Sequence, residues 1–356
     1  MAIELGHRKV GDGYPCFITF EAGATHDGVG VAKKLVEVAA RAKADAVKFQ
    51  ILEPERMMAD KNQQFSYTIL INKKTGETKE VSESLYQILK RRTLTLDEWR
   101  EVKKVADKAG LLFFATVSTT RDVDFVKEIG AHSIKICSGD VDHHPLIRYA
   151  AKTGLCLQLD TGNSTIGEVE AAVDVARSVG NDRIIIHQCP SGYPARLESI
   201  NLRIIPTLKQ MFQVPIAYSD HTPGHDMDVA AVAMGANLVE KTITLDSETP
   251  SVEHIFSLEP DEAVAFVKTI REIEIAMGAT RRMMSPEERK KRNMTRRSCY
   301  YKSDMKKGDA LDESSLEFSR PGIGISPTQI DNLIGKKLVA NKKSGEMVQW
   351  SDLSQG

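Results

Sequence analysis

Val214-Pro-Ile-Ala-Tyr-Ser-Asp-His-Thr222 is the stretch that decides the fold, because an apolar run ends there in a polar cluster. Residues 214–217 predict a buried strand, and the Ser219-Asp220-His221-Thr222 cluster cannot pack in a core without hydrogen-bonding partners. A strand that ends in this way, in a chain of alternating strands and helices, is expected to present the cluster to a site. His221 is therefore a candidate metal ligand or acid–base residue.

The rest of the chain repeats this strand-and-helix pattern. Strand-like runs occupy residues 16–21, 46–50, 111–116, 133–137, 156–160, 183–188, 214–219 and 237–241. Each is followed by helical sequence, over about 260 residues in all, which predicts a (β/α)8 barrel. A doubly wound open sheet is the alternative, and it is weakened because no GxGxxG follows the first strand.

The last part of the chain differs from the barrel sequence. Residues 280–297 are basic and methionine-containing and predict a linker, partly helical, whereas residues 298–356 hold short strand-like pieces and many turns. We therefore expect a barrel over residues 1–279, a linker over 280–297 and a small β-rich domain over 298–356. A domain of about 60 residues has a marginal core, so it should pack on the barrel or on a neighbouring subunit.

Composition excludes several classes of protein. The 356 residues are 41% hydrophobic and 27% charged, with a net charge of -1, which gives no support for a nucleic-acid or membrane surface. No apolar stretch approaches the roughly 20 residues that span a bilayer, and the N-terminus lacks the apolar core of a signal peptide. The five cysteines are widely spread, which favours reduced thiols and a cytoplasmic protein.

Polar or ionisable residues end nearly every predicted strand, at the place where a barrel of this kind has its active site. Lys48 and Lys135 lie within apolar strands, where an unpaired ammonium is costly, and two inward lysines suit a phosphate or carboxylate ligand. Each lysine could instead form a structural ion pair with Glu21 or Asp140. Ser138, after the strand that holds Lys135, and Thr116, at the end of the third strand, can add hydroxyl donors for the same anion.

A divalent cation is a second candidate ligand of these strand ends. His221 and Asp220, together with the carboxylates Glu21 and Glu240, offer the nitrogen and oxygen donors that such an ion requires.

Five motifs lie at the predicted strand ends: Glu21-Ala-Gly-Ala-Thr-His-Asp-Gly28, Val47-Lys-Phe-Gln50, Ile134-Lys-Ile-Cys-Ser-Gly-Asp140, Cys189-Pro-Ser-Gly-Tyr-Pro194 and Tyr218-Ser-Asp-His-Thr222. Together they resemble the sialic acid (N-acetylneuraminate) synthase family. The tail resembles the family's C-terminal antifreeze-like (SAF) domain through Arg296-Arg-Ser298, Ile323-Gly-Ile-Ser-Pro327 and Leu333-Ile-Gly-Lys336. The resemblance follows the family's order and covers nearly the whole chain.

This resemblance implies a phosphoenolpyruvate-dependent, aldol-type condensation in a (β/α)8 barrel. C3 of phosphoenolpyruvate attacks the open-chain aldehyde of an N-acetylated amino sugar, water adds at C2, and phosphate leaves to give a nonulosonic acid. A divalent ion, Mn²⁺ or Mg²⁺, would polarise the aldehyde. The resemblance also implies a domain-swapped homodimer, in which Arg320 of the small domain reaches the active site of the other subunit.

Roles for individual residues follow from the same resemblance. The expected catalytic residues are Glu21, Asp140 and His221, with Asp140 handling protons and His221 binding the metal ion. The phosphoenolpyruvate ligands would be Lys48, Thr116, Lys135, Ser138 and Ser219. Ser191 and Tyr193 would make contacts on the sugar and phosphate sides, and Gln50, Glu253 and Arg320 would contact the sugar.

The chain departs from the family pattern where a second metal ligand is expected. The family's eighth strand ends in a histidine, and here the triplet is Glu240-Lys241-Thr242. Threonine is a poor ligand for a divalent ion compared with imidazole. Either the metal affinity is lowered, or the reaction proceeds without the ion, or another side chain compensates: Glu21, Asp220 or His254.

Three functions remain open from the sequence. The first is the nonulosonic acid synthase. The second is a catalytically altered or silent family member that binds a sugar or a partner, which the missing histidine favours. The third is another phosphoenolpyruvate–aldehyde condensing enzyme, acting on a phosphorylated sugar such as arabinose 5-phosphate, which the antifreeze-like tail disfavours. The sequence does not identify the sugar.

Overall fold

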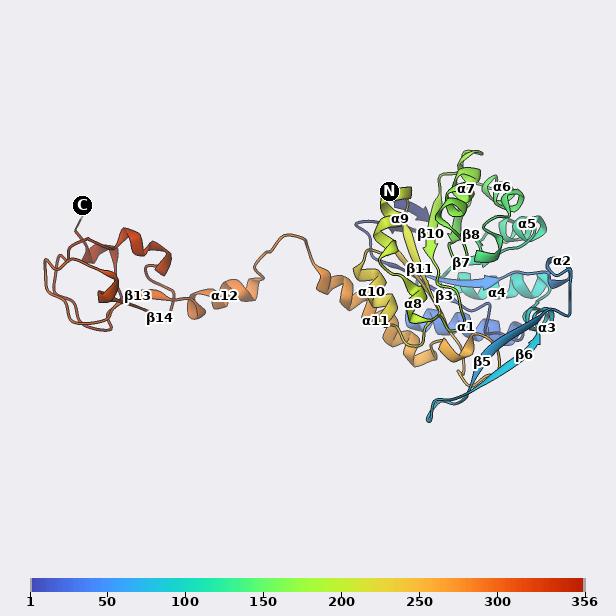
Figure 1. Ribbon diagram of the computed structural model, residues 1–356, viewed down its shortest axis with the longest axis horizontal. Coiled ribbons are helices and arrows are strands. Elements are labelled where there is room, and N and C mark those ends of the chain that lie inside the picture. Colours follow the sequence, from blue (N-terminus) through green and yellow to red (C-terminus); the bar gives the residue numbers. More distant parts are fainter. Residues whose placement is uncertain (1, 355–356) are drawn as a thin grey trace. The chain divides into compact units, whose positions relative to one another are not determined.

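Eight parallel strands close into a barrel in the computed structural model, which describes residues 2–354 (Figure 1). Closure pairs the last barrel strand with the first, so that Thr242 lies opposite Glu21. The predicted (β/α)8 barrel is confirmed, with strand ends shifted by at most two residues. The strands are β3 (Phe17–Glu21), β4 (Ala46–Gln50), β7 (Leu112–Thr116), β8 (Ser133–Ile136), β9 (Cys156–Asp160), β10 (Ile184–Gln188), β11 (Ile216–Asp220) and β12 (Leu238–Thr242).

Helices surround the barrel and bury their apolar faces against it. Three of them begin with a capping box, in which a threonine and an acidic residue three positions later satisfy the free N–H groups of the first turn. The longer helices are α1 (Val29–Ala42), α4 (Leu96–Lys108), α5 (Thr120–Glu128), α6 (His144–Ala151), α7 (Ile166–Arg177), α9 (Ile204–Phe212), α10 (Asp226–Ala233) and α11 (Pro260–Met277). The shorter ones are α2 (Pro54–Met57), α3 (Leu85–Arg91) and α8 (Leu197–Ile200).

Two antiparallel hairpins flank the barrel, and neither is predicted from the sequence. The first, β1 (Ala2–Leu5) and β2 (Arg8–Gly11), packs its apolar side chains against residues at the N-terminal ends of the strands. The second, β5 (Gln64–Asn72) and β6 (Glu77–Ser84), is inserted between β4 and β7 and leads into α3 (Figure 1). It shares a small apolar cluster with α3 and Val252. The β1–β2 hairpin thus covers the N-terminal end of the barrel with apolar residues. The β5–β6 hairpin adds a layer of residues at the other end.

The chain separates into two compact units, of which one ends at Gly278 and the other begins at Ala279. The second unit contains α12 (Pro286–Thr295), which lies in the predicted linker, and the antiparallel pair β13 (Ser298–Tyr301) and β14 (Leu316–Ser319). A core of its own is centred on Cys299, Tyr301, Leu333 and Val348. The predicted small β-rich domain after the barrel is confirmed. Among the helices of residues 2–354, none is long and apolar enough to cross a membrane.

Candidate active site

A cavity of about 350 Å³ opens at the C-terminal ends of the barrel strands, where barrels of this kind hold their active sites. We call its strand-end residues the floor: Glu21, Lys48, Thr116, Lys135, Asp160 and Glu240. We call the residues that line it from α2, the β5–β6 hairpin, α3 and the loop after β12 the wall: Met57, Phe65, Leu85, Ile88, Leu89, Arg92, Val252 and Glu253.

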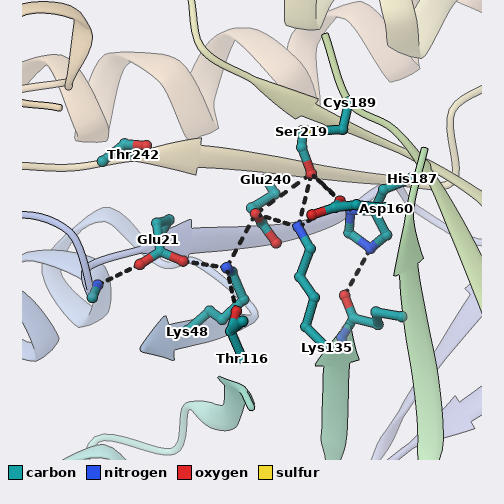
Figure 2. A network of polar contacts seen from close by, with 12 residues as sticks. Glu21, Lys48, Thr116, Lys135, Asp160, His187, Cys189, Ser219, Glu240 and Thr242 are labelled. Carbon is teal, nitrogen blue, oxygen red and sulfur yellow. Dashed lines mark hydrogen bonds and ion pairs between the residues drawn. The ribbon is translucent and has the colours of Figure 1, made fainter. Parts of the chain in front are cut away.

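Lys48 has a partner for each of its ammonium protons. Its Nζ forms a salt bridge with Glu21, lies 3.3 Å from Glu240 Oε1 and donates to Thr116 Oγ1 at 3.3 Å (Figure 2). Burial alone would lower the pKa of Lys48, but the charges of Glu21 and Glu240 outweigh burial and hold this pKa above its usual value. The ammonium is therefore retained in the barrel at neutral pH.

Lys135 is the second cation of the floor and is only 2% exposed. Its Nζ lies 2.6 Å from Glu240 Oε1, 3.0 Å from Asp160 Oδ1 and 3.0 Å from Ser219 Oγ (Figure 2). Burial would raise the pKa of Glu240, but Lys135 and Lys48 hold it well below the usual range. Both lysines therefore line the cavity and are also ion-paired. The alternative of an ion pair with Glu21 is found for Lys48, whereas Asp140 pairs with neither lysine.

Hydrogen bonds extend from the floor into the barrel interior. His187 Nδ1 lies 2.9 Å from Ser219 Oγ, and its Nε2 lies 2.8 Å from Gln158 Oε1 (Figure 2). Gln158 in turn donates to Ser133 Oγ at 3.0 Å. Burial lowers the pKa of His187 well below its usual value, and Lys135 adds to this effect, so the imidazole is neutral. This series of hydrogen bonds fixes the Ser219 hydroxyl beside Lys135.

His221 lies on another side of the same cavity. Its Nδ1 lies 3.2 Å from the Pro190 carbonyl oxygen, and its ring lies 4.7 Å from that of Tyr193. Burial lowers the pKa of His221 to about 4, which leaves a neutral imidazole that can accept a proton or bind a cation through Nε2.

The side chains around His221 do not form a metal site of the expected kind. No group of three or more His, Cys, Asp or Glu residues within residues 2–354 is arranged to hold a metal ion. Thr242 lines the cavity, but its hydroxyl donates to Glu253 Oε2 at 3.4 Å. Asp220 is held by Lys241 and Thr222, and His254 Nδ1 lies 2.7 Å from Thr244 Oγ1. The residues present therefore do not fit the two-histidine ion site of the resemblance.

Glu253 is a buried acid at the junction of floor and wall. Burial raises its pKa to about 7, the charges of Arg92 and Lys48 oppose this shift, and the Glu21 carboxylate adds to it. Its carboxyl can therefore exchange a proton near neutral pH, which a general acid or base requires.

The structure brings most of the predicted site residues to the cavity. Gln50, Ser138, Tyr193 and Glu253 line it, in addition to the floor residues and His221. Ser138 packs against Gly162 in the loop after β9, so closely that a Cβ on Gly162 would clash with the Ser138 hydroxyl.

Four predicted residues lie elsewhere. Asp140 accepts a hydrogen bond from Cys137 Sγ at 3.4 Å and does not line the cavity. Ser191 is exposed, donates to Asn163 at 2.7 Å and lines a neighbouring cavity. Ser219 lies beneath the floor, and Arg320 lies exposed in the second unit.

Sequence reasoning did not select two charged residues that line this cavity. Asp160 is at a predicted strand end, so the alternation of strands and helices could have identified it. Arg92 follows a predicted helix, and nothing in Arg91-Arg92 indicates which of the two arginines is buried. Only the packing of α3 against the barrel decides this.

Comparisons with known proteins agree with this architecture. The model of the NeuB family matches residues 35–282, and that of the SAF domain matches residues 296–354. The N,N'-diacetyllegionaminic acid synthase of Legionella pneumophila is 32% identical over 98% of this chain and 97% of its own length. The N-acetylneuraminate-9-phosphate synthase of Homo sapiens is 30% identical, over 96% of this chain and 93% of its own length.

A solved structure gives the same result. The sialic acid synthetase of Leptospira borgpetersenii, crystallised in complex with citrate, superposes with a TM-score of 0.71 at 30% identity. The match covers 82% of this chain and 95% of that one.

Proposed function

Because this chain belongs to the NeuB family, we propose that it condenses phosphoenolpyruvate with the aldehyde of an N-acetylated amino sugar to give a nonulosonic acid and phosphate. The observation that carries the proposal is the floor, where Lys48 and Lys135 are buried at the strand ends of a cavity of about 350 Å³. Two fixed ammonium groups suit the phosphate and carboxylate of phosphoenolpyruvate.

The ion pairs of the floor determine which partners a bound anion would have to displace. Each lysine already contacts three oxygen atoms, among them those of Glu21, Asp160 and Glu240. Burial raises the pKa of Asp160, whereas Lys135 and Lys48 lower that of Glu240, so Asp160 takes up a proton more readily than Glu240. A bound anion therefore replaces hydroxyl and carboxylate partners of lysines that remain charged throughout.

The proposed reaction balances without an oxidant or reductant. The C2–C3 π electrons of phosphoenolpyruvate form a bond from C3 to the aldehyde carbon, and the aldehyde oxygen takes up the displaced electron pair and a proton. Water adds to C2 and gives up a proton. The C2–O bond to phosphate then breaks, the C2 hydroxyl loses its proton, and a ketone and inorganic phosphate result.

Release of phosphate tests this function directly. The purified protein is mixed with phosphoenolpyruvate and, in turn, N-acetylmannosamine, its 6-phosphate and 2,4-diacetamido-hexoses, and inorganic phosphate is measured. Sugar-dependent release is expected with at least one of them. No release with any sugar contradicts the proposal, and release with arabinose 5-phosphate alone favours another condensing enzyme.

The silent-protein alternative is favoured by one observation, that Thr242 donates to Glu253 where a second metal ligand is expected. The same assay with added EDTA, and then with MnCl₂, distinguishes three outcomes. Turnover that EDTA does not change indicates a reaction independent of the divalent ion. Turnover that requires MnCl₂ supports His221 as a ligand, and no turnover in any arm supports a silent protein.

We also propose that the protein acts as a domain-swapped homodimer in which Arg320 contacts the sugar. Arg320 is exposed within its own unit and is thus available to a partner. Arg320→Ala is expected to raise KM for the sugar roughly tenfold, with little change in KM for phosphoenolpyruvate, because one charge-assisted hydrogen bond is lost. Equal effects on both substrates, or a monomer in light scattering, would refute this role.

A further inference from the structure

Arg92 is a buried cation that forms no salt bridge with any of residues 2–354. Its side chain is only 8% exposed and lines the cavity from the wall, directly after α3. Its Nη2 lacks a hydrogen-bond partner, and within residues 2–354 no carboxylate oxygen lies within 4 Å of its guanidinium. Its backbone N–H donates to the Leu89 carbonyl at 3.1 Å.

The two largest charge effects on Arg92 come from acids that line the same cavity. Burial lowers the pKa of Arg92, and Glu253 and Glu21 oppose that shift without contacting it. The neighbouring imidazoles cannot neutralise a cation: burial, together with the charge of Arg92, lowers the pKa of His26 and of His254 to about 4. Arg92 thus lines the cavity that holds Glu253 and also a neighbouring cavity lined by His26 and His254, and Glu253 exerts the largest charge effect on it.

The adjacent Arg91, in contrast, has a carboxylate partner for its guanidinium. It makes a bidentate salt bridge with Glu83, in which both oxygen–nitrogen distances are 2.6 Å, and its side chain is 44% exposed. Arg92, by contrast, is buried, and its Nη2 has no hydrogen-bond partner within residues 2–354. Burying a charge without a partner costs stability unless a ligand supplies that partner. The contrast between Arg91 and Arg92 therefore indicates that Arg92 binds an oxygen atom of a ligand.

We propose that the Arg92 guanidinium binds the carbonyl oxygen of the acceptor sugar and stabilises the negative charge that develops there. The inference rests on the function proposed above. When the C3–C1 bond forms, the electron pair of the aldehyde C=O moves onto this oxygen, and the nearby Glu253 carboxyl donates the proton that completes the hydroxyl. The proton lost by the water that adds to C2 restores the carboxyl. A fixed guanidinium stabilises such charge because it needs no reorganisation during the reaction.

This role is independent of the divalent ion of the resemblance. The guanidinium and the Thr242–Glu253 pair belong to the same cavity as His221, and the donor set there does not suit the two-histidine ion site. The Arg92 guanidinium would then polarise the aldehyde of the acceptor sugar in part, which is the role that the resemblance gives to the divalent ion.

The experiment compares Arg92→Met with Arg92→Lys and with Arg91→Met as a matched control. Arg92→Met is expected to lower kcat/KM for the sugar roughly 100-fold or more, as loss of one oxyanion donor does. KM for phosphoenolpyruvate should change less than threefold. Arg92→Lys should recover part of the loss, since it keeps the charge without the planar fork. Arg91→Met should keep the activity of the wild type.

Thermal unfolding provides a readout that a structural role would not give. Without ligand, Arg92→Met is expected to unfold at or above the temperature of the wild type, because it removes a buried charge that has no partner. An active-site variant that is inactive and yet no less stable supports ligand binding. A lower unfolding temperature together with wild-type kinetics overturns the inference.

Other outcomes also decide the matter. An equal loss in Arg91→Met and Arg92→Met, or an equal rise in KM for both substrates, overturns the role of Arg92. Dependence on Arg92 with the 6-phosphate alone shows that the bound group is a phosphate, and this too overturns it.

The failure of the proposed function is distinguishable from the failure of this inference. If the wild type releases no phosphate with any sugar, calorimetry of the same sugars is carried out in the presence of phosphoenolpyruvate. Sugar binding that Arg92→Met weakens and Arg91→Met does not then supports Arg92 without catalysis. No sugar binding to the wild type, or binding equally strong in Arg92→Met, overturns the inference.

Discussion

The floor and the wall of the cavity differ in how their charges are compensated. On the floor, two lysines face three carboxylates, and Lys135 Nζ lies 2.6 Å from Glu240 and 3.0 Å from Asp160. On the wall, Arg92 is buried with no carboxylate oxygen within 4 Å in the part of the chain that the structure describes. The two regions line one cavity and nevertheless carry different electrostatic costs.

The ion-paired residues of the floor contribute to the stability of the barrel, whereas Arg92 on the wall is expected to bind a ligand. Removing one partner of the floor network leaves a buried charge uncompensated, which destabilises the protein. Removing Arg92 breaks no salt bridge among the described residues, although it removes a charge that lowers the pKa of Glu253. Stability and activity should therefore change together for floor variants and separately for wall variants. Variants of Lys135 and Glu253 probe the floor and the wall, and a variant of Thr242 probes metal binding in the same cavity.

The largest effect is expected from Lys135→Met. The variant leaves Glu240 and Asp160 without their main partner, so the free energy of unfolding in urea at pH 7.5 should fall by about 3–5 kcal/mol. Phosphate release should fall roughly 100- to 1,000-fold, as for the loss of one charged donor. Adding Glu240→Gln should restore part of the stability and none of the activity.

Lys33→Met is the matched control for Lys135→Met. Lys33 pairs with Glu101 on the surface, where both side chains are partly exposed, and such pairs contribute little. A similar loss of stability in both variants would show that the floor network is no more important than a surface ion pair.

The second effect concerns the pH dependence of stability at Glu253. Burial raises its pKa from about 4.5 to about 7, so the native protein holds a proton that the unfolded chain has released between these values. This contribution to stability is complete below pH 4.5 and is lost as pH rises through 7. Between pH 4.5 and 7.5 the wild type should lose about 3 kcal/mol more than Glu253→Gln.

Urea unfolding across this pH range measures the difference. Glu272→Gln is the control, because this carboxylate lies on the surface of α11, 3.7 Å from Lys268. It should follow the wild type at every pH. If Glu253→Gln also follows the wild type, Glu253 is ionised throughout and cannot donate the proton at neutral pH.

The smallest effect is expected from Thr242→His. Thr242 and His221 line the same cavity, so the variant adds an imidazole near the existing one. Mn²⁺ affinity measured by calorimetry should tighten roughly tenfold, or about 1.4 kcal/mol. His221→Ala in the Thr242→His background should remove the gain. An unchanged affinity would exclude Thr242 as the position that limits metal binding.

Much of the barrel could be predicted from local sequence. Each strand is a short apolar run followed by a helical segment, and the position of strand ends such as Lys48 and Lys135 follows once the barrel closes. The hairpin β5–β6 could not be predicted in this way, because its second strand is largely polar and exposed and lacks the alternation of a half-buried strand. Without the hairpin and α3, the wall and Arg92 could not be placed.

The sequence by itself determined the order of strands and helices, the small second domain and the residues at the strand ends, because these depend on periodicity and motifs along the chain. Only the tertiary structure decided which charges meet. Lys135 pairs with Asp160 and Glu240 rather than Asp140, and Arg92 is buried without a partner while Arg91 pairs with Glu83. Whether a charge is compensated depends on distances of a few ångströms between distant segments, and sequence spacing does not encode those distances.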